Sequence, residues 1–157
     1  MLEIEWSKLG ISPQQFGAFG EHYARALLML YGCRTYAPDI DDHGIDLLVE
    51  THERILKMQI KTIRLRAGYV FMKERDFCIQ DSSLYLFLIV LTDGLEPSVY
   101  LIPANAWTRT DKPCFVYHAY DTPEYGVNIS VRSMAQLEEY QLQRVAPVVF
   151  GKRNTHI

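Results

Sequence analysis

The sequence has 157 residues, of which 48% are hydrophobic and 22% are charged, and its formal net charge is −3. A chain of this length can bury roughly 68–70% of its unfolded surface in one core, so we expect a single domain over residues 1–157. This composition excludes a disordered or collagen-like chain.

The longest apolar run, residues 84–91, is far shorter than the ~20 residues of a membrane-spanning helix. The first residues contain early acids and no apolar segment, unlike a secretory signal. Three well-separated cysteines predict neither a disulfide framework nor a zinc ribbon. We therefore expect a cytoplasmic protein that has no membrane partner.

A helix is predicted to begin at Ser12-Pro13 and to end at Tyr31. Ser12 and Gln15 have the spacing of a capping box, Pro13 suits the first helical position, and Gly32 suits the left-handed residue that follows a helix. On a helical wheel, one wide arc is apolar or small and is expected to face a sheet: Phe16, Gly17, Phe19, Gly20, Tyr23, Ala24, Leu27 and Leu30. Glu21 falls at the border of this arc, so we expect its carboxylate to lie along a packed interface.

Strands follow the helix. Residues 45–50 and 55–63 alternate with period two around the polar segment 51–54, which predicts a hairpin. The other predicted strands are at 33–37, 69–72, 84–91 (buried), 99–102 and 127–131 (weaker). A short helix is predicted at about 74–81, and a last helix runs from Ser133 to Val145, capped by Ser133 with Gln136. Residues 38–44 are rich in turn-forming residues, and residues 103–125 are predicted to be irregular. This order predicts an α/β (α+β) domain with a mixed sheet, a core of about residues 12–103 and a C-terminal strand and helix within 127–146.

The hairpin brings polar side chains together. If Glu50 opposes Ile55, then Asp46 lies opposite Gln59, and Lys61 projects from the same face. Side chains directly opposite each other have Cβ atoms about 4.5–5.5 Å apart, near enough for two oxygen ligands to share one cation. We expect a helix to cover this face.

These residues resemble a known family. Gly-Glu-His-Tyr-Ala around Glu21, Gly-Ile-Asp ending at Asp46 and Gln-Ile-Lys from Gln59 to Lys61 resemble the PD-(D/E)XK nuclease superfamily. They are most similar to the branch in which glutamine replaces the second acid (QxK), as in Mrr-like restriction endonucleases. The resemblance covers about residues 16–64, and the segments at 84–91 and 103–107 resemble a small bacterial domain family placed in that superfamily. Two departures are Gly-Ile-Asp in place of Pro-Asp and the glutamine itself.

The resemblance implies a restriction-endonuclease-like αβββαβ core with helices flanking the sheet, and metal-assisted hydrolysis of DNA phosphodiesters with Mg²⁺ or Mn²⁺. Asp46 would bind the metal with the side-chain oxygen of Gln59 and the backbone carbonyl of Ile60, while Glu21 would reach it through water or support Lys61. Lys61 would position the attacking water and offset charge in the transition state. Because glutamine lacks a charge, we expect weaker metal binding. The resemblance further implies a role in defence, repair or mobile-element activity.

Basic residues concentrate between Thr51 and Arg75, where seven lysines and arginines accompany two acids, while the other residues are net acidic. Such a stripe can attract phosphate groups, and the candidate DNA contacts are Lys57, Arg64, Arg66 and Lys73. A solvated charged face is the alternative. Cleavage of both strands would require a homodimer or a partner subunit.

Three other interpretations stay open. Asp46, Gln59 and Lys61 can form an inert salt-bridge and hydrogen-bond cluster. The chain can be a catalytically inactive nuclease fold that binds nucleic acid or a protein partner. It can also be a purely structural or partner-binding domain.

Overall fold

The structure is a computed structural model that describes residues 3–40 and 43–151, so residues 41–42 of the turn-rich segment and both ends of the predicted domain lie outside the described residues. Its helices are α1 (Pro13–Leu30), α2 (Val131–Gln136) and α3 (Leu142–Val149). Its strands are β1 (Arg34–Tyr36), β2 (Leu47–Glu50), β3 (Ile55–Arg64), β4 (Tyr69–Lys73), β5 (Leu84–Leu91), β6 (Ser98–Pro103), β7 (Phe115–His118) and β8 (Glu124–Asn128).

The strands form two sheets. The larger sheet has the order β1-β2-β3-β5-β6, and only its β3–β5 pair is parallel. The smaller sheet has the order β4-β8-β7 and is antiparallel throughout. A mixed sheet flanked by helices confirms the predicted fold class.

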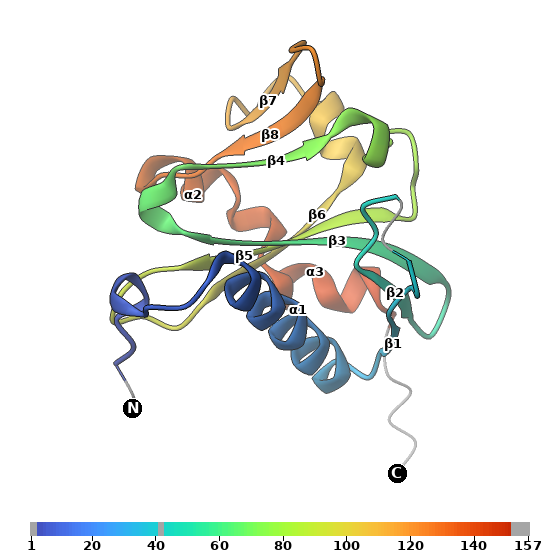
Figure 1. Ribbon diagram of the computed structural model, residues 1–157. Coiled ribbons are helices and arrows are strands. Elements are labelled where there is room, and N and C mark those ends of the chain that lie inside the picture. The colour runs from blue at the N-terminus through green and yellow to red at the C-terminus, as the bar shows by residue number, and fades with distance from the viewer. Residues whose placement is uncertain (1–2, 41–42, 152–157) are drawn as a thin grey trace.

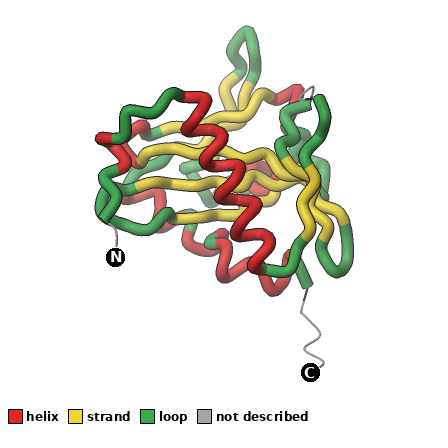
Figure 2. Tube along the Cα trace, turned by 60° about the horizontal axis from the view of Figure 1, so that its bottom comes forward, coloured by secondary structure: helices red, strands yellow, loops and turns green. Residues whose placement is uncertain are grey.

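Layers cover both faces of the larger sheet (Figure 1). One face packs against α1 and α3, where Leu28 and Ala146 share a core with Phe87 of β5. The other face packs against the smaller sheet, where Val70 and Val127 share a core with residues of β5 such as Leu86. Every residue of β5 is therefore buried, which explains its unbroken apolar sequence. Figure 2 shows α1 lying across its face of the sheet.

Helix α1 begins as its sequence predicts. The Ser12 hydroxyl accepts a hydrogen bond from the backbone N–H of Gln15, and the Gln15 side chain accepts one from the backbone N–H of Ser12, at 3.1 and 2.9 Å. Gly32 follows the helix with a φ of 83°. No helix among the described residues 3–40 and 43–151 is long and apolar enough to cross a bilayer.

The buried stripe of α1 is narrower than predicted. Gly20, Ala24 and Leu28 are buried and follow one i, i+4 ridge of the helix, whereas Leu30 is 74% exposed. Leu30 lies two residues beyond Leu28, about 200° around the wheel, so both cannot face the sheet. The ridge approaches β3 closely: an added Cβ at Gly20 would stand 1.7 Å from Oγ1 of Thr62.

The predicted helix over residues 74–81 is wrong, because only a single 3-10 turn forms at Glu74–Asp76. Tertiary contacts hold this segment in another shape: the N–H of Glu74 donates to the carbonyl of Pro123, and Phe77 is fully buried. At the far end of this segment, Asp81 accepts hydrogen bonds from Ser83 and Lys57. The connection between β3 and β5 therefore contains β4 and two 3-10 turns in place of the helix of an αβββαβ core.

The C-terminal region also differs from prediction. The cap is Ser130, whose hydroxyl accepts from the N–H of Ser133, and the single predicted helix is divided into α2 and α3. Helix α2 ends at Gln136, and a 3-10 turn follows at Glu138–Tyr140. Helix α3 begins after Gln141, which has an extended ψ of 132° and bridges Tyr100 of β6. The stretch 103–125 is not irregular throughout, because it contains β7 and a 3-10 helix at Ala104–Thr108.

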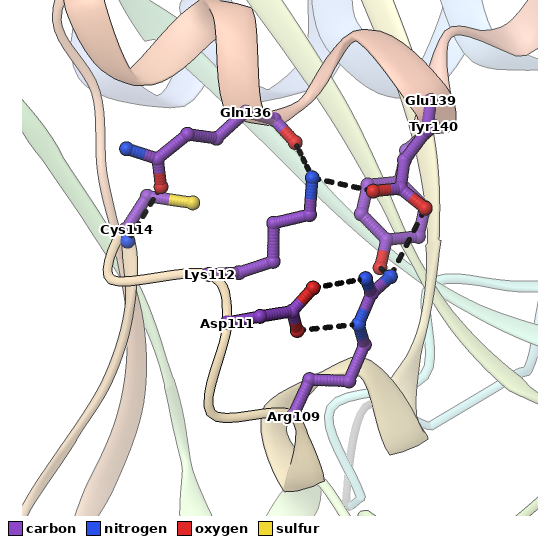
Figure 3. Close-up of polar contacts among 7 residues, drawn as sticks. All are labelled: Arg109, Asp111, Lys112, Cys114, Gln136, Glu139 and Tyr140. Atoms are coloured by element: carbon purple, nitrogen blue, oxygen red, sulfur yellow. Dashed lines mark hydrogen bonds and ion pairs between the residues drawn. The ribbon is translucent and has the colours of Figure 1, made fainter.

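A polar cluster fixes the segment that leads into β7 (Figure 3). The guanidinium of Arg109 donates to Asp111, Glu139 and Tyr140, and the ammonium of Lys112 pairs with Glu139. Lys112 and Arg109 lower the pKa of Glu139 through these contacts. Since its charged groups are paired with one another, the cluster is a structural tie between β7 and the α2–α3 region.

Candidate active site

All the residues predicted to be catalytic or to bind the metal line one cavity of about 790 Å³: Glu21, Asp46, Gln59, Ile60 and Lys61. They come from α1, from the residue before β2 and from β3, and β4 with the turn after it supplies the remaining wall. That wall includes Phe71, Lys73, Arg75 and Asp76, and His43 with Gly44 completes the lining. The residues predicted from the sequence therefore form one wall of the cavity, and β4 of the smaller sheet with the turn after it forms the other wall.

The cavity lies at the start of β2, where the pairing of that strand with β3 stops. Beyond this point one edge of β3 has no strand partner among the described residues, while the other edge stays paired with β5. The register of β2 and β3 is the predicted one, with Leu47 opposite Met58 and Glu50 opposite Ile55. Pairing stops at Leu47, so Asp46 is not a ladder partner of Gln59. Instead the Asp46 N–H donates to the Met58 carbonyl at 2.9 Å.

Asp46 is anchored to this open edge by its side chain. The backbone N–H of Ile60 donates to Oδ2 of Asp46 at 2.6 Å. The N–H and C=O of one strand residue point to the same side, so the Ile60 carbonyl is also directed toward the edge where Asp46 lies. A carboxylate and a backbone carbonyl oxygen are thereby brought together.

The expectation that a helix covers the polar face is wrong. Met58 and Ile60 pack toward α1, while Ile63 packs toward the smaller sheet. By alternation, Gln59 and Lys61 also face the smaller sheet. Glu21 reaches the same cavity from α1, which lies on the opposite face, so the cavity extends around the exposed edge of β3.

Gln59 is the buried polar residue of the cavity, with 6% of its surface exposed. Among the described residues, its Oε1 has no hydrogen-bond partner. Leaving a buried acceptor unsatisfied costs about 1–3 kcal/mol, so a ligand for this oxygen would relieve a real penalty. Gly44, with a φ of 66°, lets the loop close over it: an added Cβ would lie 2.4 Å from Nε2 of Gln59.

The donor set fits a hard divalent cation. It consists of carboxylates, an unsatisfied amide oxygen and a backbone carbonyl, which are the oxygen ligands that Mg²⁺ and Mn²⁺ take, with water filling the remaining positions. Within residues 3–40 and 43–151 there is no cluster of three or more His, Cys, Asp or Glu side chains suited to a metal ion. A site here would therefore depend on Gln59 and Ile60 as well as on Asp46 and Glu21.

The predicted DNA-contacting residues do not form one stripe. Lys73 lines the cavity, and Arg66 lines a separate hollow of about 280 Å³ beside Asp93. Lys57 pairs with Asp81 at 2.6 Å, and this contact lowers the pKa of Asp81 to about 2. Arg64 lies on the α1 face, with its guanidinium 4.4 Å from the ring centre of Phe16.

Sequence reasoning did not select Phe71, Arg75 or Asp76, which line the cavity. Arg75 belongs to the basic stretch between Thr51 and Arg75 but was not among the candidate DNA contacts. Phe71 and Asp76 belong to no motif. They reach the site only because β4 leaves the larger sheet and pairs with β8.

The solved structures that resemble this one include two nucleases. Hjc of Archaeoglobus fulgidus, a Holliday junction resolvase, aligns with a TM-score of 0.55 at 7% sequence identity over 83% of this chain and 94% of its own. The bacterial homing endonuclease I-Ssp6803I aligns with a TM-score of 0.51 at 16% identity over 88% of this chain and 91% of its own. The chain has a nuclease fold. Neither family models nor curated proteins give a match to the sequence, so this likeness is one of fold.

Proposed function

We propose that this protein is a metal-dependent DNA endonuclease of the PD-(D/E)XK kind, in its glutamine-containing QxK branch. One observation carries the proposal: Glu21, Asp46, Gln59, Ile60 and Lys61 line a single cavity. Support comes from the fold, which is shared with a Holliday junction resolvase and a homing endonuclease.

Each residue has a role that its position supports. Asp46, Oε1 of Gln59 and the Ile60 carbonyl would hold Mg²⁺ or Mn²⁺, with Glu21 reaching it through water. Bound there, the cation would polarise the scissile phosphate and lower the pKa of a water molecule. The N–H of Ile60 fixes the Asp46 carboxylate at 2.6 Å. Lys61 orients the attacking water by hydrogen bonding and offsets the negative charge that develops on the phosphate oxygens.

DNA phosphates are the expected partners of the basic residues at the cavity rim. Of the four residues selected from the sequence, Lys73 is the one that lines the cavity, where Arg75 accompanies it. Arg66, which lines the separate hollow beside Asp93, would contact a more distant phosphate. Lys57 and Arg64 already have protein contacts, so we expect their replacement to weaken DNA binding less than replacement of Lys73.

A catalytically inactive module that binds nucleic acid or a protein is the second candidate. The uncharged Gln59 favours it, together with the lack of a three-residue His, Cys, Asp and Glu cluster in the described part of the chain. This alternative expects salt-dependent DNA binding that survives Asp46→Ala and no cleavage with any divalent ion.

A single active site of this kind would cleave one DNA strand. A double-strand cut would need two copies of the chain or a partner subunit. Sedimentation with and without DNA, alongside the ratio of nicked to linear plasmid, measures this directly. A linear product made by a protein that stays monomeric on DNA would contradict this expectation.

The deciding experiment is cleavage of supercoiled plasmid and of short single- and double-stranded DNA with Mg²⁺ and with Mn²⁺. Lys61→Ala and Asp46→Ala should abolish cleavage without loss of fold. Lys57→Ala is the matched control, because this lysine is on the same face of β3 but pairs with Asp81 outside the cavity. At saturating DNA it should retain the wild-type rate. Equal cleavage by wild type, Lys61→Ala and Asp46→Ala would exclude the proposed site.

A further inference from the structure

Aromatic rings form a continuous row on the outer face of the smaller sheet. Tyr69 and Phe71 alternate along β4 with the buried Val70 and Met72, so both rings point away from the core. The ring centres of Tyr69 and Phe71 are 6.2 Å apart and nearly parallel, at 19°. We call Phe71, Tyr69, His118 and Tyr120 the aromatic row.

The row continues across the sheet to the end of β7. The ring centres of Tyr69 and His118 are 6.1 Å apart, and these two rings meet edge to face at 65°. The ring centres of His118 and Tyr120 are 4.9 Å apart at an interplanar angle of 13°. Phe71 is 43% exposed and Tyr120 is 59% exposed. Both ends of the row therefore offer apolar ring surface to solvent.

The centre of the row is held in place by the sheet beneath it. Gly126 of β8 makes room for the Tyr69 ring, because an added Cβ would stand 2.2–2.5 Å from its Oη and ring carbons. The Tyr69 hydroxyl donates to Oε1 of Glu124 at 2.8 Å. The Arg109 cluster fixes the chain just before β7 (Figure 3). Rings fixed in this way lose little conformational entropy when a flat ligand stacks on them.

The row begins at the candidate active site. Phe71 lines the cavity that contains Lys61, and so does Lys73, two residues along β4 on the same face. Figure 1 shows β4 running alongside β3, above it in that view. A ligand strand lying on the row would therefore lead directly into the cavity, where Lys73 and Arg75 can contact its phosphates.

The spacing favours unpaired bases. Each strand of a DNA duplex advances only 3.4 Å per nucleotide, whereas neighbouring rings along Phe71, Tyr69 and His118 are about 6 Å apart. A strand that places bases on these rings must be unstacked and extended. Flat aromatic rings also bind a base through its π-face, which is accessible only where the base is unstacked from its neighbours.

We propose that the aromatic row binds unpaired DNA bases beside the candidate active site, so that the substrate is DNA with a single-stranded segment adjoining the cut. The position of the cut depends on the proposed nuclease function, whereas binding by the row does not. Glu124 lies on the same face of the sheet, opposite Lys73, and its negative charge offsets the positive charge of the lysine. We therefore expect stacking to contribute more than charge to the binding of DNA along the row.

The test is equilibrium binding of a fluorescent single-stranded oligonucleotide and of a blunt duplex with the same sequence, measured in EDTA so that cleavage plays no part. We expect tighter binding of the single strand. Phe71→Ala and Tyr120→Ala should each weaken it about fivefold or more, while changing duplex binding little. Tyr117→Ala is the control, since this tyrosine is 49% exposed but pairs with Tyr125 on the other face of β7.

Equal affinity for the two DNAs, or wild-type affinity in both Phe71→Ala and Tyr120→Ala, would overturn the inference. Variants that change only the sedimentation coefficient of the free protein would assign the row to a contact between two copies of the chain and would overturn it too. If single-strand binding depends on the row but plasmid is never cut, the proposed nuclease function fails and the row remains. If cleavage depends on Lys61 but not on the row, the proposed nuclease function stands and the inference about a single-stranded segment beside the cut fails.

Discussion

Replacing Gly20 with alanine tests how closely α1 approaches β3, and with it the position of Glu21. The added Cβ would lie 1.7 Å from Oγ1 and 3.0 Å from Cβ of Thr62. Rotation of the Thr62 side chain removes the first contact but not the second. The helix must therefore move outward, and Glu21, the next residue, moves with it.

Two opposing effects set the magnitude. Alanine in place of glycine inside a helix gains about 1 kcal/mol of helix propensity. Overpacking a closely fitted contact costs about 1–3 kcal/mol, and a Cβ–Cβ separation of 3.0 Å that no side-chain rotation relieves belongs at the upper end of that range. We expect Gly20→Ala to lower the free energy of unfolding by about 1–2 kcal/mol.

Gly17→Ala is the matched control on the same helix, because an added Cβ there meets nothing within 4 Å. It should raise the free energy of unfolding by about 0.5–1 kcal/mol. Urea unfolding measures both variants, and Gly20→Ala combined with Thr62→Gly, which removes both Oγ1 and Cβ of Thr62, measures the coupling between positions 20 and 62. The double variant should recover about 1 kcal/mol or more relative to the sum of the single effects.

The reasoning is refuted if Gly20→Ala is as stable as Gly17→Ala, or if the two sites show no coupling energy. A second measurement concerns activity: a shift of about 1 Å at Glu21 can lower a cleavage rate by up to about 100-fold. Unchanged cleavage by a destabilised Gly20→Ala protein would remove Glu21 from the catalytic set and leave the packing argument intact.

Two further predictions follow from side chains outside the cavity. The Lys57 ammonium and the Ser83 hydroxyl hold the pKa of Asp81 at about 2, below its ordinary 3.8. The pair therefore stabilises the fold fully above about pH 4 and loses this contribution as pH falls toward 2. Urea unfolding of wild type and Asp81→Asn should differ by about 1–2 kcal/mol at pH 6 and converge near pH 2, and a constant difference would exclude the ion pair as its cause. Cys78 is exposed while Cys33 and Cys114 are buried, and burial raises the pKa of the Cys114 thiol, so a thiol reagent should modify Cys78 rapidly in the native protein and the others only on unfolding. Rapid loss of all three thiols would contradict these burial assignments.

Local sequence was sufficient where the structure depends on neighbours along the chain. The cap of α1 at Ser12 and Gln15 and the register of the β2–β3 hairpin both follow from residues within a few positions of one another. The hairpin register in turn placed Gln59 and Lys61 on one face. The prediction failed at residues 74–81, where an isolated helix of eight residues is marginal and distant partners such as Pro123 decide the outcome.

The candidate site divides in the same way. The sequence by itself was enough to propose Glu21, Asp46, Gln59, Ile60 and Lys61 as candidates, because the hairpin groups Asp46, Gln59 and Lys61 and the order of the motifs resembles that of a known nuclease superfamily. Only the tertiary structure shows which layer faces Gln59 and Lys61. Period-two alternation assigns residues to one face of a sheet or the other, but it does not say which element packs on each face. It is the smaller sheet that faces Gln59 and Lys61, formed by β4 pairing with β8 across more than fifty residues of chain. That pairing alone brings Phe71 to the cavity and places it in line with Tyr69 and His118.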